Sequence, residues 1–199
     1  MRKFFGGLIT VSLLFFLNAA NASAYSYAIA EDPMAVIFKA AVNAAKEGKW
    51  DQVSKKASEG IAMQKGHLFE ANHLQPSFQD MIGKKDVSGT AEVFANLVYI
   101  SIVEKLHRNQ KEKLKDIKNS KDRMVLARKT YLDILDGNVK KENPARSVAI
   151  LNEFQKAFDK IGNPGLFGIG KKDPDPAGYE QAVKKIEEFL LKAFPGFKA

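Results

Sequence analysis

The 199-residue chain contains no cysteine. This absence excludes disulfide bonds, a thiolate nucleophile, lipid attachment to a lipobox cysteine and haem attached through Cys-x-x-Cys-His. A protein that folds outside the cytoplasm without disulfides depends on packing for its stability. The chain is long enough for that, because a domain of this size buries roughly 70% of the surface of its unfolded chain.

Motifs of the common enzyme classes are missing as well. The sequence has no Gly-x-Ser-x-Gly, no His-Glu-x-x-His and no phosphate-binding glycine loop. The glycines of "GLFGIG" (165–170) do not follow a predicted strand, so they do not indicate a nucleotide site. We therefore expect a protein that is not an enzyme.

Long apolar runs are missing except at the N-terminus. Two basic residues precede the mostly apolar stretch 4–17, and the small residues "ASA" follow at 22–24. This layout is typical of a secretory signal peptide, and the apolar stretch is shorter than the about 20 residues of a membrane span. We predict a signal peptide over 1–24 and a mature domain over 25–199 that is periplasmic or secreted, with no transmembrane span.

The charge balance is moderately basic, with 31 Lys and Arg against 23 Asp and Glu. Most of the lysines alternate with acidic residues along predicted helices, which is typical of an ordinary solvated surface. The pattern favours mild attraction to an anionic envelope surface, or to another envelope protein, as partner. It does not indicate nucleic acid.

Glycine and proline are absent from 90–136, a run of 47 residues. The first part of this run, 91–106, is apolar nearly all round a helix, which places it in the middle of a bundle. The remaining pattern is also helical, with much Ala, Leu, Lys and Glu and few alternating β-branched residues. We predict an all-α, single-domain bundle of six to seven antiparallel helices that begins with an αα-hairpin.

Capping residues, glycines and prolines indicate where these helices begin and end. Asp32 is the expected N-cap of the first helix, with Pro33 at its first position, and Asn143-Pro144 opens a later one. The predicted segments are helices to Gly48, over 51–64, over 67–82 with an interruption at Pro76, from 91 to a turn near 119–120, over 124–135 with a stop at "DGN" (136–138), over 144–161 and over 179–194, with an irregular segment at 162–178.

Every one of the three histidines has a glutamate three residues away. On a helix this spacing is nearly one turn, so that carboxylate and imidazole can share a metal ion, as in ferritin-like carboxylate bundles. The candidate ligands for iron or another divalent transition metal are His67, Glu70, His73, Glu104 and His107. The alternative is that these are ordinary surface pairs, each worth about 0.2–0.5 kcal/mol.

Two segments, "NLVYISIVEKLHRNQKE" (96–112) and "ARKTYLDILDGNV" (127–139), resemble the helical extracytoplasmic domains associated with bacterial iron uptake. The resemblance implies an exported, all-helical domain with an iron-handling role, and it carries no specific ligand across. The chain lacks the methionine-rich or tightly clustered motifs of a dedicated metal site. We therefore expect a non-enzymatic binding or interaction protein of the cell envelope, with a metal-handling helical bundle as the alternative.

Overall fold

The structure is a computed structural model that describes residues 31–165 and 169–199. The predicted signal peptide over 1–24 and its cleavage site lie outside the described residues. The described residues form helices and no named strand, with one isolated bridge between Asn163 and Lys172. The predicted all-α fold is therefore confirmed.

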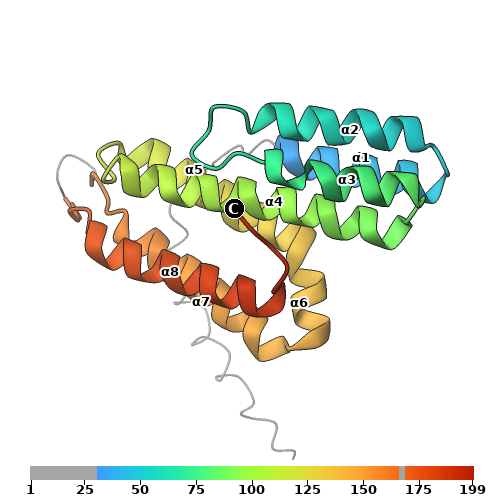
Figure 1. Ribbon diagram of the computed structural model, residues 1–199. Helices are drawn as coiled ribbons and strands as arrows, with labels where there is room; N and C mark the ends of the chain where they lie inside the picture. The colour runs from blue at the N-terminus through green and yellow to red at the C-terminus, as the bar shows by residue number, and fades with distance from the viewer. Residues whose placement is uncertain (1–30, 166–168) are drawn as a thin grey trace, which may run out of the picture.

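The helices follow one another closely along the chain (Figure 1). The α5 helix, the π-helix η2 and α6 continue without a break, and the 3-10 turn η1 leads directly into α3, so the described residues form seven helical rods. This number lies within the predicted range. The bounds are α1 Pro33–Lys46, α2 Trp50–Met63, η1 Asn72–Leu74, α3 Gln75–Gly83, α4 Val87–Lys111, α5 Ile117–Thr130, η2 Tyr131–Leu135, α6 Asp136–Glu142, α7 Pro144–Lys160 and α8 Pro176–Ala193.

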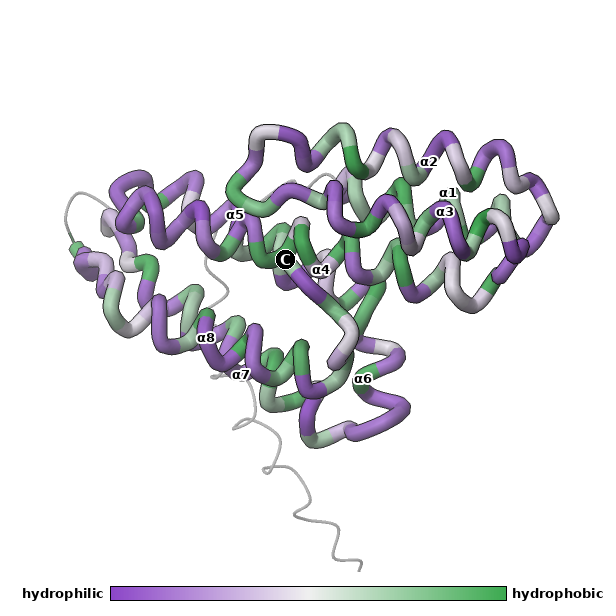
Figure 2. Tube along the Cα trace, in the orientation of Figure 1, coloured by the Kyte–Doolittle hydropathy of each residue, from purple (hydrophilic) through white to green (hydrophobic). Residues whose placement is uncertain are grey.

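The α4 helix forms the centre of the molecule. It lies between a layer of α1, α2 and α3 on one side and the α7–α8 pair on the other, and it also packs against α5 (Figure 1). Every residue from Phe94 to Glu104 is buried, and apolar residues line the sides on which α4 meets its neighbours (Figure 2). The expectation of a central helix over 91–106 is confirmed. None of the described helices is long and apolar enough to cross a membrane.

The first two helices pack against each other and against α4. Asp32 caps α1 as predicted, since its Oδ1 atom accepts a hydrogen bond of 2.9 Å from the Met34 N–H and Pro33 occupies the first turn. Gly60 allows α2 to approach α4 closely. A Cβ atom at this position would lie 2.3 Å from Cδ2 of Leu97, so any larger residue would overlap the core.

The predicted third helix is wrong over its first half. Residues 64–71 form turns and a loop, and α3 begins only at Gln75. Pro76 lies in the first turn of α3, where a proline is tolerated because that turn leaves its N–H groups unpaired. His67 and Glu70 therefore do not lie on a helix.

The predicted turn at 119–120 lies earlier, at 112–116. Lys113 and Leu114 adopt the left-handed conformation with φ of 52° and 56°, and Leu114 is fully buried. Asp116 then caps α5 by accepting a hydrogen bond of 2.9 Å from the Asn119 N–H. Burial of Leu114 fixes the turn at a position that polar composition does not reveal.

The predicted stop at 136–138 is also wrong. The chain passes through η2 into α6, and Gly137 lies inside that helix. Asp136 is held in place because it accepts hydrogen bonds from the Tyr131 hydroxyl at 2.8 Å and the Ser147 hydroxyl at 2.6 Å. These bonds offset the cost of about 1 kcal/mol that glycine imposes on a helix.

The irregular segment between α7 and α8 is shorter than predicted. Asp175 caps α8 by accepting a hydrogen bond of 2.9 Å from the Gly178 N–H, so α8 begins at Pro176 and not at Tyr179. The predicted start of α7 at Asn143-Pro144 is confirmed, because Asn143 caps it through a bond of 3.0 Å from the Arg146 N–H.

Candidate functional site

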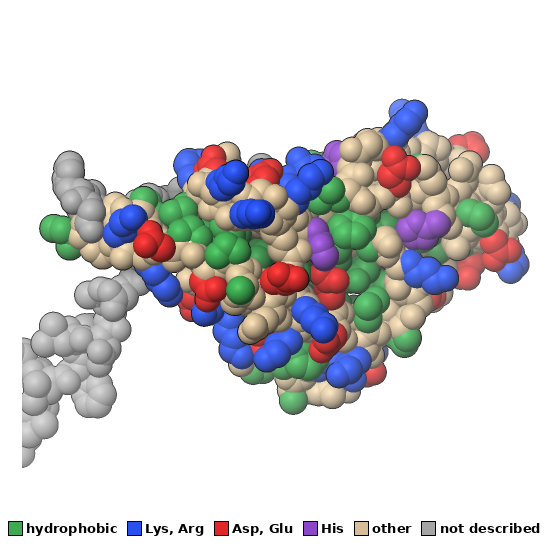
Figure 3. Space-filling view, turned by 60° about the vertical axis from the view of Figure 1, so that its left-hand side comes forward, with side chains coloured by type: hydrophobic (Ala, Val, Ile, Leu, Met, Phe, Trp, Pro, Cys, Tyr) green, Lys and Arg blue, Asp and Glu red, His purple; other side chains and the backbone are tan. Residues whose placement is uncertain are grey.

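The five predicted metal ligands lie in different places. His67 Nδ1 lies 3.9 Å from Glu104 Oε1. Within the described residues, this is the one close contact between two of the five candidate ligands. Glu70 stays within its own loop, where it accepts hydrogen bonds from the Gly66 N–H at 3.1 Å and from Asn72 Nδ2 at 2.9 Å. Figure 3 shows histidine side chains at separate places on the visible face.

His107 faces α8 and not the other histidines. Its Nε2 atom lies 2.5 Å from Glu187 Oε1, and its ring contacts the ring of Phe69 edge to face, with centroids 5.0 Å apart. Glu104 instead accepts hydrogen bonds from Arg108 and from the Phe69 N–H. The Glu104–His107 spacing therefore places the two side chains on the same helix without bringing them to a common ion.

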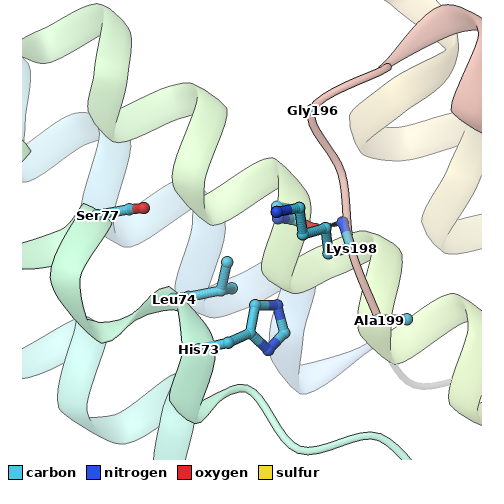
Figure 4. A pocket seen from close by; sticks show the side chains of 7 residues that line it. His73, Leu74, Ser77, Gly196, Lys198 and Ala199 are labelled. Atoms are coloured by element: carbon cyan, nitrogen blue, oxygen red, sulfur yellow. Dashed lines mark hydrogen bonds between the residues drawn. The ribbon is translucent and has the colours of Figure 1, made fainter.

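His73 lines a shallow pocket of about 330 Å³ beside the C-terminal residues. Its ring points toward Lys198 and Ala199, as Figure 4 shows. The Lys198 N–H donates a hydrogen bond of 3.1 Å to Asn96 Oδ1 and fixes the tail there. Among the described residues, no carboxylate side chain lines this pocket.

The described residues contain no group of three or more His, Asp or Glu side chains placed to hold a metal ion. Loop geometry at 66–71 explains part of this result, because Glu70 and His73 do not share a helical turn. What the structure builds around Glu104 and His67 is instead a polar pocket, whose base is formed by buried charges from distant parts of the chain.

Asp32 is the most connected of these buried charges. It is 3% exposed. Besides the Met34 N–H of its own helix, it accepts hydrogen bonds from Ser101 Oγ at 3.3 Å and Thr130 Oγ1 at 2.9 Å, and Lys105 Nζ lies 2.7 Å from it. The carboxylate therefore joins the start of α1 to the middle of α4 and the end of α5.

The environment of Asp32 favours its charged form. Burial alone raises the pKa of this carboxyl, but the Lys105 ammonium and the hydrogen bonds from Lys105, Met34 and Thr130 lower it, and the pKa lies below its ordinary value. The charged pair is thus maintained in a nearly dry position.

Glu104 forms the second buried charge, at 4% exposure. Its Oε1 atom accepts a hydrogen bond of 2.7 Å from Arg108 Nη2, and its Oε2 atom accepts one of 3.3 Å from the Phe69 N–H. The carboxylate therefore fastens the loop after α2 onto α4, and it brings His67 to the edge of the pocket.

The pocket between these two carboxylates has a volume of about 230 Å³. Gln64, the C-cap residue of α2, is 3% exposed, and its buried Oε1 atom has no hydrogen-bond partner among residues 31–165 and 169–199. An orphaned buried oxygen is rare in native proteins. The residues around the pocket are Asp32, Pro33, Met34, Met63, Gln64, His67, Ser101, Glu104, Lys105, Arg108 and Arg123.

Sequence reasoning identified Glu104 and His67 but not the remainder of this pocket. One signal was available: Ser101, Glu104 and Lys105 are polar residues near the end of the mostly apolar segment 91–106. The partners of these residues lie far away in the sequence, so no local pattern connects them.

Comparison with known proteins does not identify a family. No family model matches the sequence, and no curated protein or solved structure matches it significantly.

Proposed function

We propose that this chain is a non-enzymatic binding protein of the cell envelope and that the pocket lined by Gln64, Glu104 and Lys105 holds its ligand. The observation that carries the proposal is the side chain of Gln64, a residue that lines the pocket and whose buried Oε1 atom has no hydrogen-bond partner among the described residues. A buried acceptor without a donor costs about 1–3 kcal/mol. A ligand that donates a hydrogen bond to this atom recovers that cost.

The size of the pocket points to a small molecule as ligand. A volume of about 230 Å³ equals about seven to eight water molecules, at about 30 Å³ for each water in the liquid. This is less than the about 300–1,000 Å³ of pockets that bind drug-sized molecules. The pocket therefore suits a metabolite of a few non-hydrogen atoms better than a peptide or a lipid.

The metal-handling alternative has weaker support. It relies on His67 and Glu104, whose Nδ1 and Oε1 atoms are 3.9 Å apart. Glu104 already accepts hydrogen bonds from Arg108 and from the Phe69 N–H. An ion at this position would have to displace the guanidinium from the carboxylate.

Export is part of the proposal, and it is supported by the sequence of residues 1–24 alone. N-terminal sequencing of the protein from the extracytoplasmic fraction tests it. We expect the mature chain to begin at Tyr25. A chain that retains Met1 and remains in the cytoplasm would contradict export without bearing on the pocket.

The binding proposal is tested with the low-molecular-mass fraction of an envelope extract. We expect this fraction to raise the melting temperature of the wild-type protein and to leave the Gln64→Met variant unchanged, and mass spectrometry identifies the retained compound. Calorimetric titration with Fe²⁺, Zn²⁺ and Cu²⁺ tests the alternative. A stoichiometric ion that is lost in His67→Ala would favour metal handling, and the absence of any bound compound would contradict the binding proposal.

A further inference from the structure

We infer that the ligand of this pocket is a small carboxylate that carries a hydroxyl or ammonium donor next to the carboxyl group. The inference rests on the proposed binding function and adds the chemical class of the ligand. It follows from an account of which hydrogen-bonding groups in the pocket wall are already used and which are free.

The two carboxylates of the pocket wall already have hydrogen-bond partners within the protein. Both oxygen atoms of Asp32 accept hydrogen bonds, from the Met34 N–H, Lys105 and Thr130. Both oxygen atoms of Glu104 accept hydrogen bonds as well, from Arg108 and from the Phe69 N–H. Each carboxylate also has a cationic partner, Lys105 for Asp32 and Arg108 for Glu104, so neither is an unpaired negative charge that would attract a cationic ligand.

The wall has three permanent cations, Lys105, Arg108 and Arg123. Two of them already donate most of their hydrogen bonds within the protein. Lys105 Nζ is bound by Asp32, the Ser101 hydroxyl and the Ser101 carbonyl, which uses the three donors of an ammonium group. Arg123 binds Glu112 through both of its terminal nitrogens and also binds Asn109. Neither side chain has much capacity left for a ligand.

Arg108, the third cation, still has N–H donors that can bind a ligand. Its one hydrogen bond to another described residue runs from Nη2 to Glu104 Oε1, whereas a guanidinium has five N–H donors. Its side chain is 41% exposed, so the other donors can reach the pocket. The planar fork of a guanidinium suits a carboxylate, which it can bind with two parallel hydrogen bonds.

The second free group is Gln64 Oε1, which needs a donor. A ligand that satisfies both groups therefore carries an anion at one end and a hydroxyl or ammonium group close to it. Arg123 is already paired with Glu112, which does not line the pocket, so Arg108 is the cation of the wall with donors left for an anion. Its planar fork matches the two oxygen atoms of a single carboxylate.

Isothermal titration calorimetry with three compounds of nearly equal size tests the inference. Lactate has both features, propanoate lacks the donor and lactamide lacks the charge; alanine is added as the ammonium-bearing equivalent of lactate. We expect lactate or alanine to bind more tightly than propanoate and lactamide. A charged hydrogen bond contributes about 1.5–3 kcal/mol, so we expect Arg108→Gln to weaken binding about tenfold or more.

Variants inside and outside the pocket test whether lactate binds there or elsewhere on the protein surface. Gln64→Met should abolish the preference for lactate over propanoate. Ser120→Ala removes the orphaned hydroxyl of a residue that does not line the pocket, and Arg128→Gln removes an exposed arginine of α5. Both should leave binding unchanged.

The outcomes distinguish the inference from the function on which it rests. Lactamide that binds as tightly as lactate, or binding that is indifferent to Arg108→Gln, would overturn the inference. So would failure of lactate and alanine to bind while a compound from the envelope extract does, and in each of these cases the binding function stands. Failure of every compound, the extract included, would overturn both.

Discussion

Two buried side-chain atoms among the described residues lack a hydrogen-bond partner, and they lie in different settings. Gln64 Oε1 lies at the pocket wall, whereas Ser120 Oγ belongs to α5 and does not line the pocket. Both cost stability in the free protein, because a buried polar atom loses its hydrogen bonds to water. Of the two residues, Gln64 is the one that lines the pocket described above.

This difference gives a prediction about stability and binding together. Gln64→Met keeps the length of the side chain and removes the orphaned oxygen, so we expect it to raise the free energy of unfolding by about 1 kcal/mol. Urea denaturation of the free protein measures this change. If Gln64→Met is more stable than wild type but no longer binds the ligand, then the Gln64 oxygen functions in ligand binding and not in stability. Gln64→Met that is less stable than wild type by more than about 1 kcal/mol would show that the oxygen has an internal role.

Asp32 gives a prediction about pH. The pKa of Asp32 in the folded protein lies below the ordinary value of 3.8. The charged carboxylate therefore stabilises the fold at pH values above the pKa of the unfolded protein. This stabilisation is lost as the pH falls through the pKa of the folded protein. Near neutral pH we expect Asp32→Asn to destabilise the protein by about 3 kcal/mol, because Lys105 loses its buried partner. The difference from wild type should stay constant at pH values above the unfolded pKa and shrink as the pH falls below it and through the lower folded pKa.

Denaturant titrations at several pH values measure this difference. Asp51→Asn is the control, since Asp51 is exposed in the first turn of α2, and its effect should be within about 0.5 kcal/mol. An Asp32→Asn penalty that is the same at low and neutral pH would contradict a role for the charged pair.

At the residue scale, the sequence predicts single features of the site but not their combination. Asp32 is recognisable as a helix cap, and Glu104 as a polar residue in an apolar helix. Gln64 carries no signal at all, because a glutamine near a helix end is ordinary. The pocket joins these residues only after the fold has brought 32, 64 and 104 together.

At the scale of elements, two glycines inside helices give opposite predictions. Gly60 lies where α2 meets α4, and a Cβ atom there would lie 2.3 Å from Cδ2 of the fully buried Leu97. Gly137 lies in α6 with open space around its Cα atom. Alanine is preferred over glycine in both helices by propensity alone, by about 1 kcal/mol.

We expect Gly60→Ala to destabilise the protein by about 1–3 kcal/mol, because overpacking outweighs propensity. Gly137→Ala should stabilise it by about 0.5–1 kcal/mol. Melting temperatures of the two variants, measured side by side, give the sign of each effect. If Gly60→Ala is stabilising like Gly137→Ala, then α2 does not approach α4 as closely as the structure indicates.

The elements also show which boundaries a sequence can predict. Cap and proline pairs are local signals, and both Asp32-Pro33 and Asn143-Pro144 begin helices as predicted. The missed boundaries depend on tertiary contacts instead. Burial of Leu114 places one turn, and the hydrogen bonds of Asp136 carry the chain through a segment whose composition favours a stop.

At the scale of the whole molecule, α4 connects the layers. It packs against α1, α2, α3, α5 and α8, so neither layer has a core that is complete without it (Figure 1). The pocket lies on one side of this helix, and its walls come from α1, the end of α2, the loop that follows it, α4 and α5. The stability of the pocket is therefore linked to the stability of the whole bundle.

We predict that the described bundle unfolds in one cooperative step. Trp50, the only tryptophan, begins α2 and packs at the edge of the core, so its fluorescence reports on the α1–α3 layer. Far-ultraviolet circular dichroism reports on all helices. If unfolding is cooperative, the two signals give the same midpoint in urea. Different midpoints would mean that the layers unfold separately.

A tryptophan placed in α8 allows unfolding of the α7–α8 pair to be followed in the same way. Phe189 in α8 is partly buried against the core, and in the double variant Trp50→Phe with Phe189→Trp the fluorescence reports on α7 and α8. A ligand that binds only the folded state stabilises it in proportion to the logarithm of its concentration above Kd. If unfolding is cooperative as predicted, lactate at saturating concentration should raise the midpoint seen from α8 as much as the midpoint seen from α2. A shift confined to the α2 reporter would show that the pocket is stabilised locally and that α4 does not couple the two layers.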